Sequence, residues 1–196
     1  MPQTRSGERV AVALSGGVDS AVTAALLLER GHEVIGLTMQ LYPYGQGHER
    51  RARELDDAVM LARHLGIAHE IIDVRADFDR HVFDNFRSEY LSGRTPNPCV
   101  VCNKQVKFAR LHARARELDA RLATGHYAIV EHDPGAGLYR LRMAANKPKD
   151  QSYMLYRLSQ DVLCDVLFPL GSETKERVRE IARAYDLRVA HKPESQ

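Results

Sequence analysis

The sequence predicts an α/β fold, with a mostly parallel sheet, helices on both of its faces, a small hairpin insertion and a helical C-terminal segment. Short apolar runs alternate with helix-forming runs as far as Thr124, an order that is typical of parallel sheets. Two runs of alternating polar and apolar residues then flank a turn with proline and glycine, which predicts a hairpin near residues 128–143. We therefore expect one domain over residues 1–145 and a helical segment over residues 146–196.

The individual elements follow from composition and periodicity. Four short apolar runs predict the strands: residues 9–14, 33–41, 69–74 and 121–124. Runs rich in helix-forming residues predict the helices: residues 19–30, 49–65, 78–91, 103–118 and 174–187. Residues 42–48 are turn-like, and residues 92–102 are expected to form a loop because Pro96 and Pro98 disfavour regular structure.

The composition excludes several classes of protein. Three cysteines in 196 residues do not indicate a disulfide-stapled secreted fold. No secretory signal precedes the first strand, and no run approaches the roughly 20 apolar residues of a membrane helix. The net charge of +2 neither indicates nor excludes a nucleic-acid binder, since a groove can be basic in a nearly neutral protein. We expect a reduced, cytoplasmic protein with no membrane partner.

The sharpest local signal is SGGVDS, which begins at Ser15 between the first strand and the first helix. Gly16 and Gly17 let the backbone turn tightly toward a ligand, and the helix adds the positive end of its dipole. Ser15 and Ser20 add hydroxyl donors, and Asp19 either caps the helix or helps to hold a cation. The kinase-type and dinucleotide-type glycine spacings are both missing. The motif therefore predicts a phosphate-binding turn of another kind, the alternative being a plain strand-to-helix turn.

A second signal is RTPNPCVVCNK, which begins at Arg94. Its pair Cys99 and Cys102 fits a redox pair, half of a zinc site or a pair of cluster ligands. Since Asn103 leads into a helix, we expect Cys102 near a helix N-terminus and its thiol pKa to be lowered. Two buried cysteines without chemistry are the plain alternative. Four histidines that could complete a zinc site are more simply surface or packing residues: His48, His64, His69 and His126.

Several stretches resemble known proteins. SGGVDS resembles the pyrophosphate loop of the ATP pyrophosphatases. Further stretches occur in the order seen in the tRNA-specific 2-thiouridylases, and together they cover nearly the whole chain: GRTPNPCVVCNKQVKF, ATGHYA, KDQSYMLYRLSQ, LFPLG and TKERVREIA. The resemblance implies a Rossmann-like fold of the adenine nucleotide alpha hydrolase-like kind. It also implies an enzyme that uses ATP and Mg²⁺ to adenylate O2 of the wobble uridine of tRNA, after which a cysteine-bound sulfur displaces AMP to give 2-thiouridine.

The resemblance also implies the partners and the site residues. The partners are tRNA and a sulfur-donor protein, either a cysteine desulfurase or a sulfur relay. Cys102 matches the first catalytic cysteine, with Cys99 beside it in the same segment. The ATP-binding positions are Ala13, Leu14, Ser15, Gly16, Gly17, Val18, Asp19, Ser20, Met39 and Gly125. The tRNA-binding positions are Asn97, Pro98, Cys99, His126, Lys149, Asp150 and Gln151.

Without the resemblance, some of these residues have plainer interpretations. Met39 would pack in the core, Gly125 would form a turn, and Asp150 would cap a polar helix start. The basic residues of the helix after the cysteines either track the tRNA backbone or form a solvated face: Lys104, Lys107, Arg110, Arg114 and Arg116.

The sequence departs from the family's pattern in two places. Many members have Asp where this chain has Cys99, and the C-x-x-C form resembles members in which such cysteines are ligands of an iron–sulfur cluster. The family's second catalytic cysteine lies in an Ile-Cys-Phe segment beyond a stretch like KPESQ, where this sequence ends at Gln196. Cys164 lies in an apolar helical run and is expected in the core instead. We therefore expect ATP binding and adenylation, with incomplete sulfur transfer and weakened tRNA binding.

Two other functions stay open at this stage. One is an amide-forming ligase of the GMP- or NAD-synthetase kind, which would give the cysteine pair no role. The other is a non-catalytic module that binds a nucleotide or a metal. Substitution of Cys102 and measurement of tRNA-dependent pyrophosphate release distinguish the thiouridylase, the ligase and the non-catalytic module.

Overall fold

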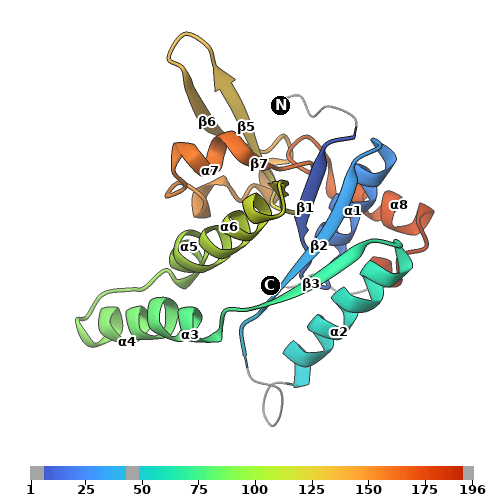
Figure 1. Ribbon diagram of the computed structural model, residues 1–196. Coiled ribbons are helices and arrows are strands. Elements are labelled where there is room, and N and C mark those ends of the chain that lie inside the picture. The colour runs from blue at the N-terminus through green and yellow to red at the C-terminus, as the bar shows by residue number, and fades with distance from the viewer. Residues whose placement is uncertain (1–6, 43–48, 192–196) are drawn as a thin grey trace.

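The computed structural model describes residues 7–42 and 49–191, and the predicted turn after residue 42 and His48 lie outside them. Five parallel strands form the main sheet in the order β3-β2-β1-β4-β7 (Figure 1). Their bounds are β1 Arg9–Ala13, β2 Glu33–Gln40, β3 Ala68–Asp73, β4 Arg121–Ala123 and β7 Val166–Leu167. The α/β fold with a parallel sheet is confirmed, and the four predicted strands agree with the structure within one residue at each end.

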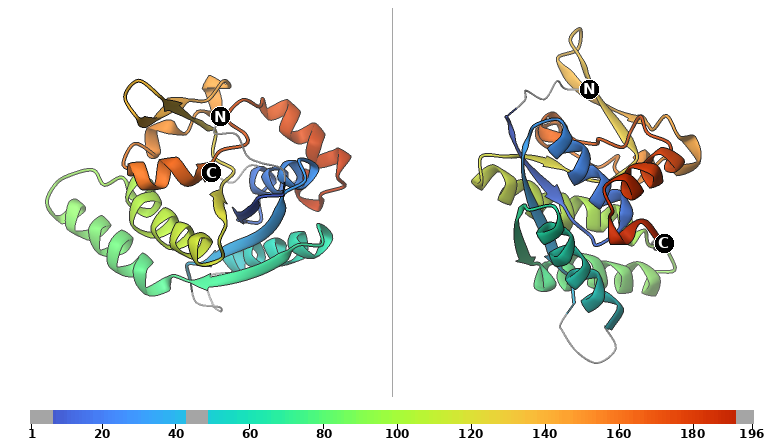
Figure 2. Two further views of the ribbon diagram at one scale, coloured as in Figure 1. Left: turned by 45° about the horizontal axis from the view of Figure 1, so that its top comes forward. Right: turned by 90° about the vertical axis from the view of Figure 1, so that its right-hand side faces the viewer.

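Helices cover both faces of this sheet (Figures 1 and 2). One face carries α1 Val18–Glu29, α2 Glu49–His64 and α8 Lys175–Ala184, whose apolar side chains share one core with Val10 and Val12 of β1. The other face carries α6 Ala109–Glu117 and α7 Gln160–Asp165, which share a second core with Ala11. Successive residues of β1 thus point into two different cores, which explains why its sequence is apolar throughout.

The strand β7 was not predicted. Its two residues lie in the run DVLCDVLF, where the sequence analysis expected helix. A two-residue strand shows no period of its own, so an apolar run that precedes it resembles a helix. The domain boundary expected near residue 145 stays a prediction, although residues beyond it contribute β7 to the main sheet and α8 to the face that carries α1.

The loop predicted over residues 92–102 is wrong at its end. The structure shows α5 Pro98–Cys102, a π-helix over Asn103–Phe108 and then α6. Asn97 caps α5, since its Oδ1 accepts a hydrogen bond from the backbone N–H of Val100 at 3.2 Å. Pro98 follows at a position where its fixed φ suits a helix start. Pro98, which was expected to disfavour regular structure, therefore begins the helix.

The segment before residue 92 is also helical without a break. It comprises α3 Arg75–Phe78, a π-helix over Asp79–Phe83 and α4 Asp84–Leu91. The predicted helix over residues 78–91 therefore starts three residues earlier. Among the described residues, no helix is both long and apolar enough to cross a membrane.

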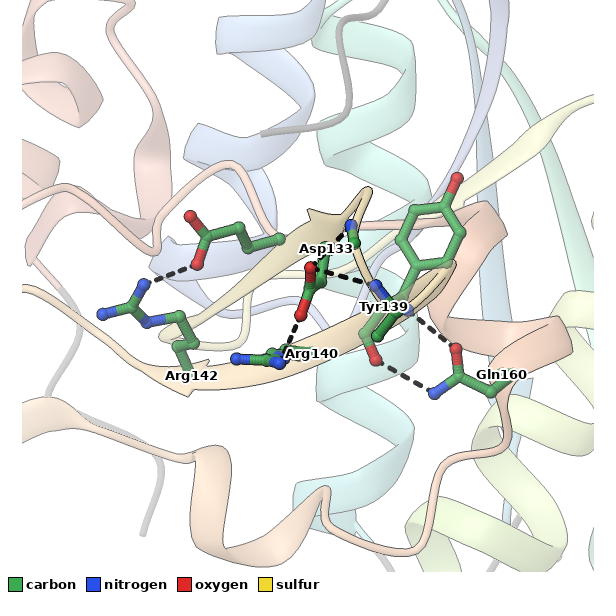
Figure 3. Close-up of polar contacts among 8 residues, drawn as sticks. Asp133, Tyr139, Arg140, Arg142 and Gln160 are labelled. Atoms are coloured by element: carbon green, nitrogen blue, oxygen red, sulfur yellow. Dashed lines mark hydrogen bonds and ion pairs between the residues drawn. The ribbon is translucent and has the colours of Figure 1, made fainter.

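The predicted hairpin is confirmed as β5 Ala128–Asp133 and β6 Leu138–Met143, which project from one end of the molecule (Figure 1). Asp133 closes the turn by accepting from the backbone N–H of Gly135 at 3.0 Å, and it forms an ion pair with Arg140 (Figure 3). Gln160, the first residue of α7, makes two hydrogen bonds with the backbone of Tyr139, at 2.8 and 2.9 Å. The hairpin is thereby held against α7 and the second core.

Candidate active site

The SGGVDS turn links β1 to α1 at the carboxyl edge of the sheet. Gly16 has a φ of +71°, and a Cβ there would lie 2.3 Å from the backbone O of Glu54 in α2. The Ser20 hydroxyl accepts from Ser15 N at 3.2 Å and donates to Gly17 O at 3.0 Å, which closes the turn. The turn is thus held at the N-terminus of α1, where backbone N–H groups and the helix dipole favour an anion.

Asp19 has a partner that the sequence analysis did not anticipate. It makes no capping hydrogen bond within α1. Its Oδ1 accepts from Lys175 Nζ at 2.6 Å and from Tyr127 Oη at 3.0 Å. Lys175 is buried at the start of α8, with its ammonium 5.7 Å from the centre of the Tyr127 ring. The ion pair therefore joins the turn to an element more than 150 residues later, and it leaves Oδ2 of Asp19 for a cation.

A cavity of about 350 Å³ lies in front of the turn. The carboxyl ends of parallel strands are the usual ligand site of such sheets. The expected ATP-binding residues that line it are Ala13, Leu14, Ser15, Asp19, Ser20, Met39 and Gly125. Gly16, Gly17 and Val18 form the turn and the start of α1 behind that lining. Two of the expected tRNA-binding residues, His126 and Gln151, line the same cavity.

Gly125 lets the loop after β4 approach the turn. A Cβ at this position would lie 2.8 Å from the backbone C of Asp19 and 2.9 Å from the backbone N of Ser20. The close approach brings His126 to the start of α1. A glycine that could have been a simple turn residue is therefore required by backbone packing.

Lys107 and His126 line another part of the same cavity. Lys107 Nζ lies 3.4 Å from His126 Nε2, and His126 Nδ1 lies 2.7 Å from Thr124 Oγ1. Burial, and then the Lys107 charge, hold the pKa of His126 well below its usual value, so its imidazole is neutral at pH 7. Burial also lowers the pKa of Lys107. A charged Lys107 only donates, so the Nε2 of a neutral His126 accepts and its Nδ1 carries the proton.

The cysteine pair lies on the helical segment that carries Lys107. Cys99 is exposed, whereas Cys102 is partly buried against an apolar cluster that includes Met39, a residue of the cavity wall. Burial raises the pKa of the Cys102 thiol, and the Lys107 charge offsets part of this effect. The expected lowering of this pKa is therefore wrong. The helix starts at Pro98 rather than Asn103, so Cys99 lies in its first turn and Cys102 lies one turn further along.

The described cysteines do not complete a metal site. Within residues 7–42 and 49–191, no group of three or more His, Cys, Asp or Glu side chains could hold a metal ion. Iron–sulfur clusters and structural zinc take four protein ligands, so Cys99 and Cys102 alone do not fit either group. Cys164 lies on α7, partly buried, and its Sγ donates to the backbone O of Asp161. All three cysteines are free thiols.

A Mg²⁺ ion that is bound to a nucleotide needs fewer ligands from the protein. It needs one or two carboxylates, with phosphate oxygens and water completing the octahedron. Asp19 supplies a carboxylate at the cavity wall, beside the anion-binding turn. The described residues therefore fit a nucleotide-bound Mg²⁺.

The other expected tRNA-binding residues lie on two loops. Asn97 and Pro98 begin α5 and are partly or fully exposed. Lys149 ends a 3-10 turn, and the two residues after it bind the base of the hairpin. Asp150 accepts from the backbone N–H of Ala144 at 2.8 Å, and Gln151 Oε1 accepts from the backbone N–H of Tyr127 at 3.0 Å. Asp150 thus closes a loop, and the alternative of a capped helix start is wrong.

The basic residues after the cysteines differ in their surroundings. Arg110 pairs with Asp77 at 2.7 Å, and Arg114 pairs with Glu70 at 2.9 Å. Lys104 and Arg116 are exposed, while Lys107 lines the cavity. This position of Lys107 and the contacts of Lys175 and Tyr127 with Asp19 were not predicted from the sequence. The signals were present in the stretches TKERVREIA and ATGHYA, but only the fold shows that their side chains meet the turn.

The chain is similar to several known proteins. The family model described as "tRNA methyl transferase HUP domain" matches residues 8–196. A protein named tRNA-specific 2-thiouridylase MnmA from Halothermothrix orenii is 48% identical over 196 residues, covering 96% of this chain and 54% of that relative. Its namesake from Pelobacter propionicus is 51% identical over 191 residues, covering 96% and 53%. The chain thus spans about half the length of the curated relatives that it matches.

Solved structures show the same fold at low sequence identity. The U34-tRNA thiolase NcsA from Methanococcus maripaludis, solved with its [4Fe-4S] cluster, superposes with a TM-score of 0.62 at 20% identity, covering 97% of this chain and 60% of that one. The NMN synthetase from Francisella tularensis superposes with a TM-score of 0.58 at 20% identity, covering 97% and 67%. These likenesses support the Rossmann-like, adenine nucleotide alpha hydrolase-like sheet.

Proposed function

The chain belongs to the tRNA methyl transferase HUP domain family, and on that premise we propose that it is the ATP-binding, adenylating part of a tRNA 2-thiouridylase. In the proposed reaction, O2 of a tRNA uridine attacks the α-phosphate of ATP and pyrophosphate leaves. The outer sulfur of a Cys102 persulfide then attacks C2, and AMP leaves with the oxygen. The Cys99 thiolate attacks the inner sulfur, so that the S–S bond breaks, the outer sulfur stays on C2 and a Cys99–Cys102 disulfide forms, which an external thiol reduces. About half of the chain is identical to the two thiouridylases described above, which supports this choice.

One observation carries the proposal. A single cavity is lined both by the turn residues Ser15 and Ser20 and by Lys107 and His126. Cys102 lies on the helical segment that carries Lys107, and it packs against the same apolar cluster as the cavity residue Met39. A nucleotide held by the turn is therefore close to a thiol-bearing helix, as adenylation followed by sulfur transfer requires.

Each group has a role in this scheme. The turn N–H groups and the dipole of α1 stabilise the charge on the leaving pyrophosphate. Met39 and Gly125 border the adenosine, and Asp19 Oδ2 helps to hold the Mg²⁺ that travels with ATP. Cys102 is the sulfur-carrying or attacking thiol, with Cys99 as its redox partner. Asn97, Pro98, Lys149, Asp150 and Gln151 contact the tRNA, and a flipped uridine reaches the cavity past His126.

The scheme also needs partners and a suitable compartment. A sulfur-donor protein, either a cysteine desulfurase or a sulfur relay, loads the sulfur. The thiols of the pair must be reduced before loading, which favours the cytoplasm.

The test is release of pyrophosphate by the purified chain with ATP, Mg²⁺ and unmodified tRNA. We expect release that depends on tRNA and disappears when the target uridine is replaced by cytidine. Gly16→Ala should abolish it, whereas Gly135→Ala at the hairpin turn should not, since a Cβ there is 3.4 Å from its nearest neighbour, Asp133 Oδ1. Release that ignores tRNA but requires an amine donor would instead support the ligase, and ATP binding with no release would support the non-catalytic module.

A further inference from the structure

Lys107 is a cation without an anionic partner in the described part of the chain. It is partly buried at the cavity wall, and no carboxylate of residues 7–42 or 49–191 forms an ion pair with it. The titratable groups that face it are the thiols of Cys99 and Cys102 on its own helical segment, and His126 on the loop after β4. Burying an unpaired ammonium is costly, so such a residue indicates that an anion enters the cavity.

The π-helix explains how Lys107 reaches this position. In an α-helix, residues five apart are rotated by about 140° and point in different directions. The wider i→i+5 bonding of the segment Asn103–Phe108 brings residues five apart much closer to one face. Lys107 can therefore line the cavity while Cys102, five residues earlier, packs on the same apolar cluster as the cavity residue Met39. Single turns of π-helix are frequent at functional sites.

His126 fixes the direction of the ammonium. Its ring is buried between Phe108 and Phe168, with ring centres 5.8 and 6.2 Å away, and Thr124 holds its Nδ1. Its Nε2 thus offers one acceptor to Lys107 at 3.4 Å. An ammonium has three donors, so Lys107 keeps others for a ligand in the cavity.

We propose that Lys107 binds the α-phosphate of ATP, the phosphate that stays with the uridine after adenylation, while the turn from Ser15 to Ser20 binds the departing pyrophosphate. This rests on the proposed function, in which the α-phosphate lies between the turn and the acceptor base. Among the described residues that line the cavity, Lys107 is the one lysine or arginine. It acts by charge and hydrogen bonding alone, and it exchanges no proton with the substrate.

The experiment compares three probes on matched variants. Binding of ATP with Mg²⁺, AMP and inorganic pyrophosphate is measured by calorimetry on the wild type, Lys107→Met, Lys107→Arg and Lys104→Met. Lys104 is an exposed lysine of the same π-helix and serves as the control. Lys107→Met should lower the affinity for AMP and for ATP by about ten- to hundredfold, the usual loss for a hydrogen bond to a charged group. The affinity for pyrophosphate should stay within about twofold of the wild type. Lys107→Arg should keep most of the affinity.

The possible outcomes distinguish a failure of the Lys107 assignment from a failure of the proposed function. If the wild type binds ATP and Lys107→Met binds ATP and AMP equally well, the Lys107 assignment is wrong and the proposed function survives. Equal losses of affinity for AMP and for pyrophosphate would also overturn the Lys107 assignment, since the sites for the α-phosphate and for pyrophosphate would then not be distinct. If the wild type binds no ATP, the proposed function itself fails and this inference fails with it.

Thermal melting distinguishes a functional lysine from a structural one. Methionine has a similar length and removes an unpaired buried charge, so the ligand-free Lys107→Met variant should melt at the same temperature as the wild type or higher. Addition of ATP should also raise the melting temperature of this variant by less than it raises that of the wild type. A lower melting temperature without ligand would show that Lys107 supports the fold, and would contradict the proposal.

Discussion

The phosphate turn and the cysteine segment serve one cavity, but the sequence specifies them in different ways. The turn is a local structure, since Gly16 and the Ser20 hydroxyl close it within six residues. The cysteine segment depends on contacts beyond its own residues, because packing against Val74, Phe78 and Val82 buries Cys102, and this burial raises the pKa of its thiol. A motif therefore predicts geometry well where its own residues supply the hydrogen bonds, and chemistry poorly where other elements supply the environment.

Gly16→Ala gives the largest expected effect and tests the local side of this comparison. The new Cβ would meet the backbone O of Glu54 at 2.3 Å while the residue holds a φ of +71°. We expect a loss of about 2–4 kcal/mol in the free energy of unfolding, measured by urea denaturation. Gly135→Ala in the hairpin turn should stay within about 0.5 kcal/mol. If Gly16→Ala were equally mild, the turn would be adaptable rather than fixed.

The Asp19–Lys175 ion pair comes next, and it shows that even the local turn needs a distant partner. Removing one member of a largely buried pair leaves the other charge unpaired, so Lys175→Met should cost about 2–3 kcal/mol. The matched control is the exposed pair Arg177–Glu180 on the same helix, where Arg177→Met should cost less than about 0.5 kcal/mol.

A double-mutant cycle sharpens the point. Asp19→Asn and Lys175→Met combined should cost less than the sum of the single changes, because the second change removes the charge left by the first. Strict additivity would mean that the 2.6 Å contact carries no coupling.

These contacts show how much the sequence could predict. Four parallel strands, the hairpin and the turn follow from periodicity and from glycines whose backbone needs are local. The strand β7 could not be found, since Val166 and Leu167 are too few to show a period and their pairing with β4 is a tertiary contact. Pro98 was wrongly predicted to lie in a loop, because a proline can either break a helix or begin one. Here Asn97 caps the helix that Pro98 begins. Lys107 and Lys175 were visible as residues, but their burial and partners depend on the assembled sheet.

His126 provides a pH test of this assembled environment. Its pKa in the folded protein is well below the value of about 6.5 that it regains on unfolding. Below about pH 6.5 the unfolded state binds a proton that the folded state does not, so stability falls as the pH falls. The loss approaches about 1.4 kcal/mol per pH unit for one such group. Urea denaturation at pH 7.5 and about 5.5 should show it, and His126→Asn should reduce the slope.

His69 complicates the measurement in a predictable way. Burial lowers its pKa as well, so part of the slope should remain in His126→Asn. A slope unchanged by the substitution would mean that His126 is protonated in the folded state. It would then repel Lys107 rather than accept its hydrogen bond, and the cavity wall would carry two charges.

The smallest expected effect concerns the two cysteines, and it tests the non-local side of the comparison. Cys99 is exposed in the first turn of α5, whereas Cys102 is partly buried and its pKa is raised. Since the thiolate is the reactive form, iodoacetamide should modify Cys102 about five- to tenfold more slowly than Cys99 at pH 7.5, as measured by peptide mass spectrometry. In urea the two rates should converge, because both effects belong to the fold. Faster modification of Cys102 in the folded protein would mean that the Lys107 charge outweighs burial, so that the ligand-free protein already holds a thiolate.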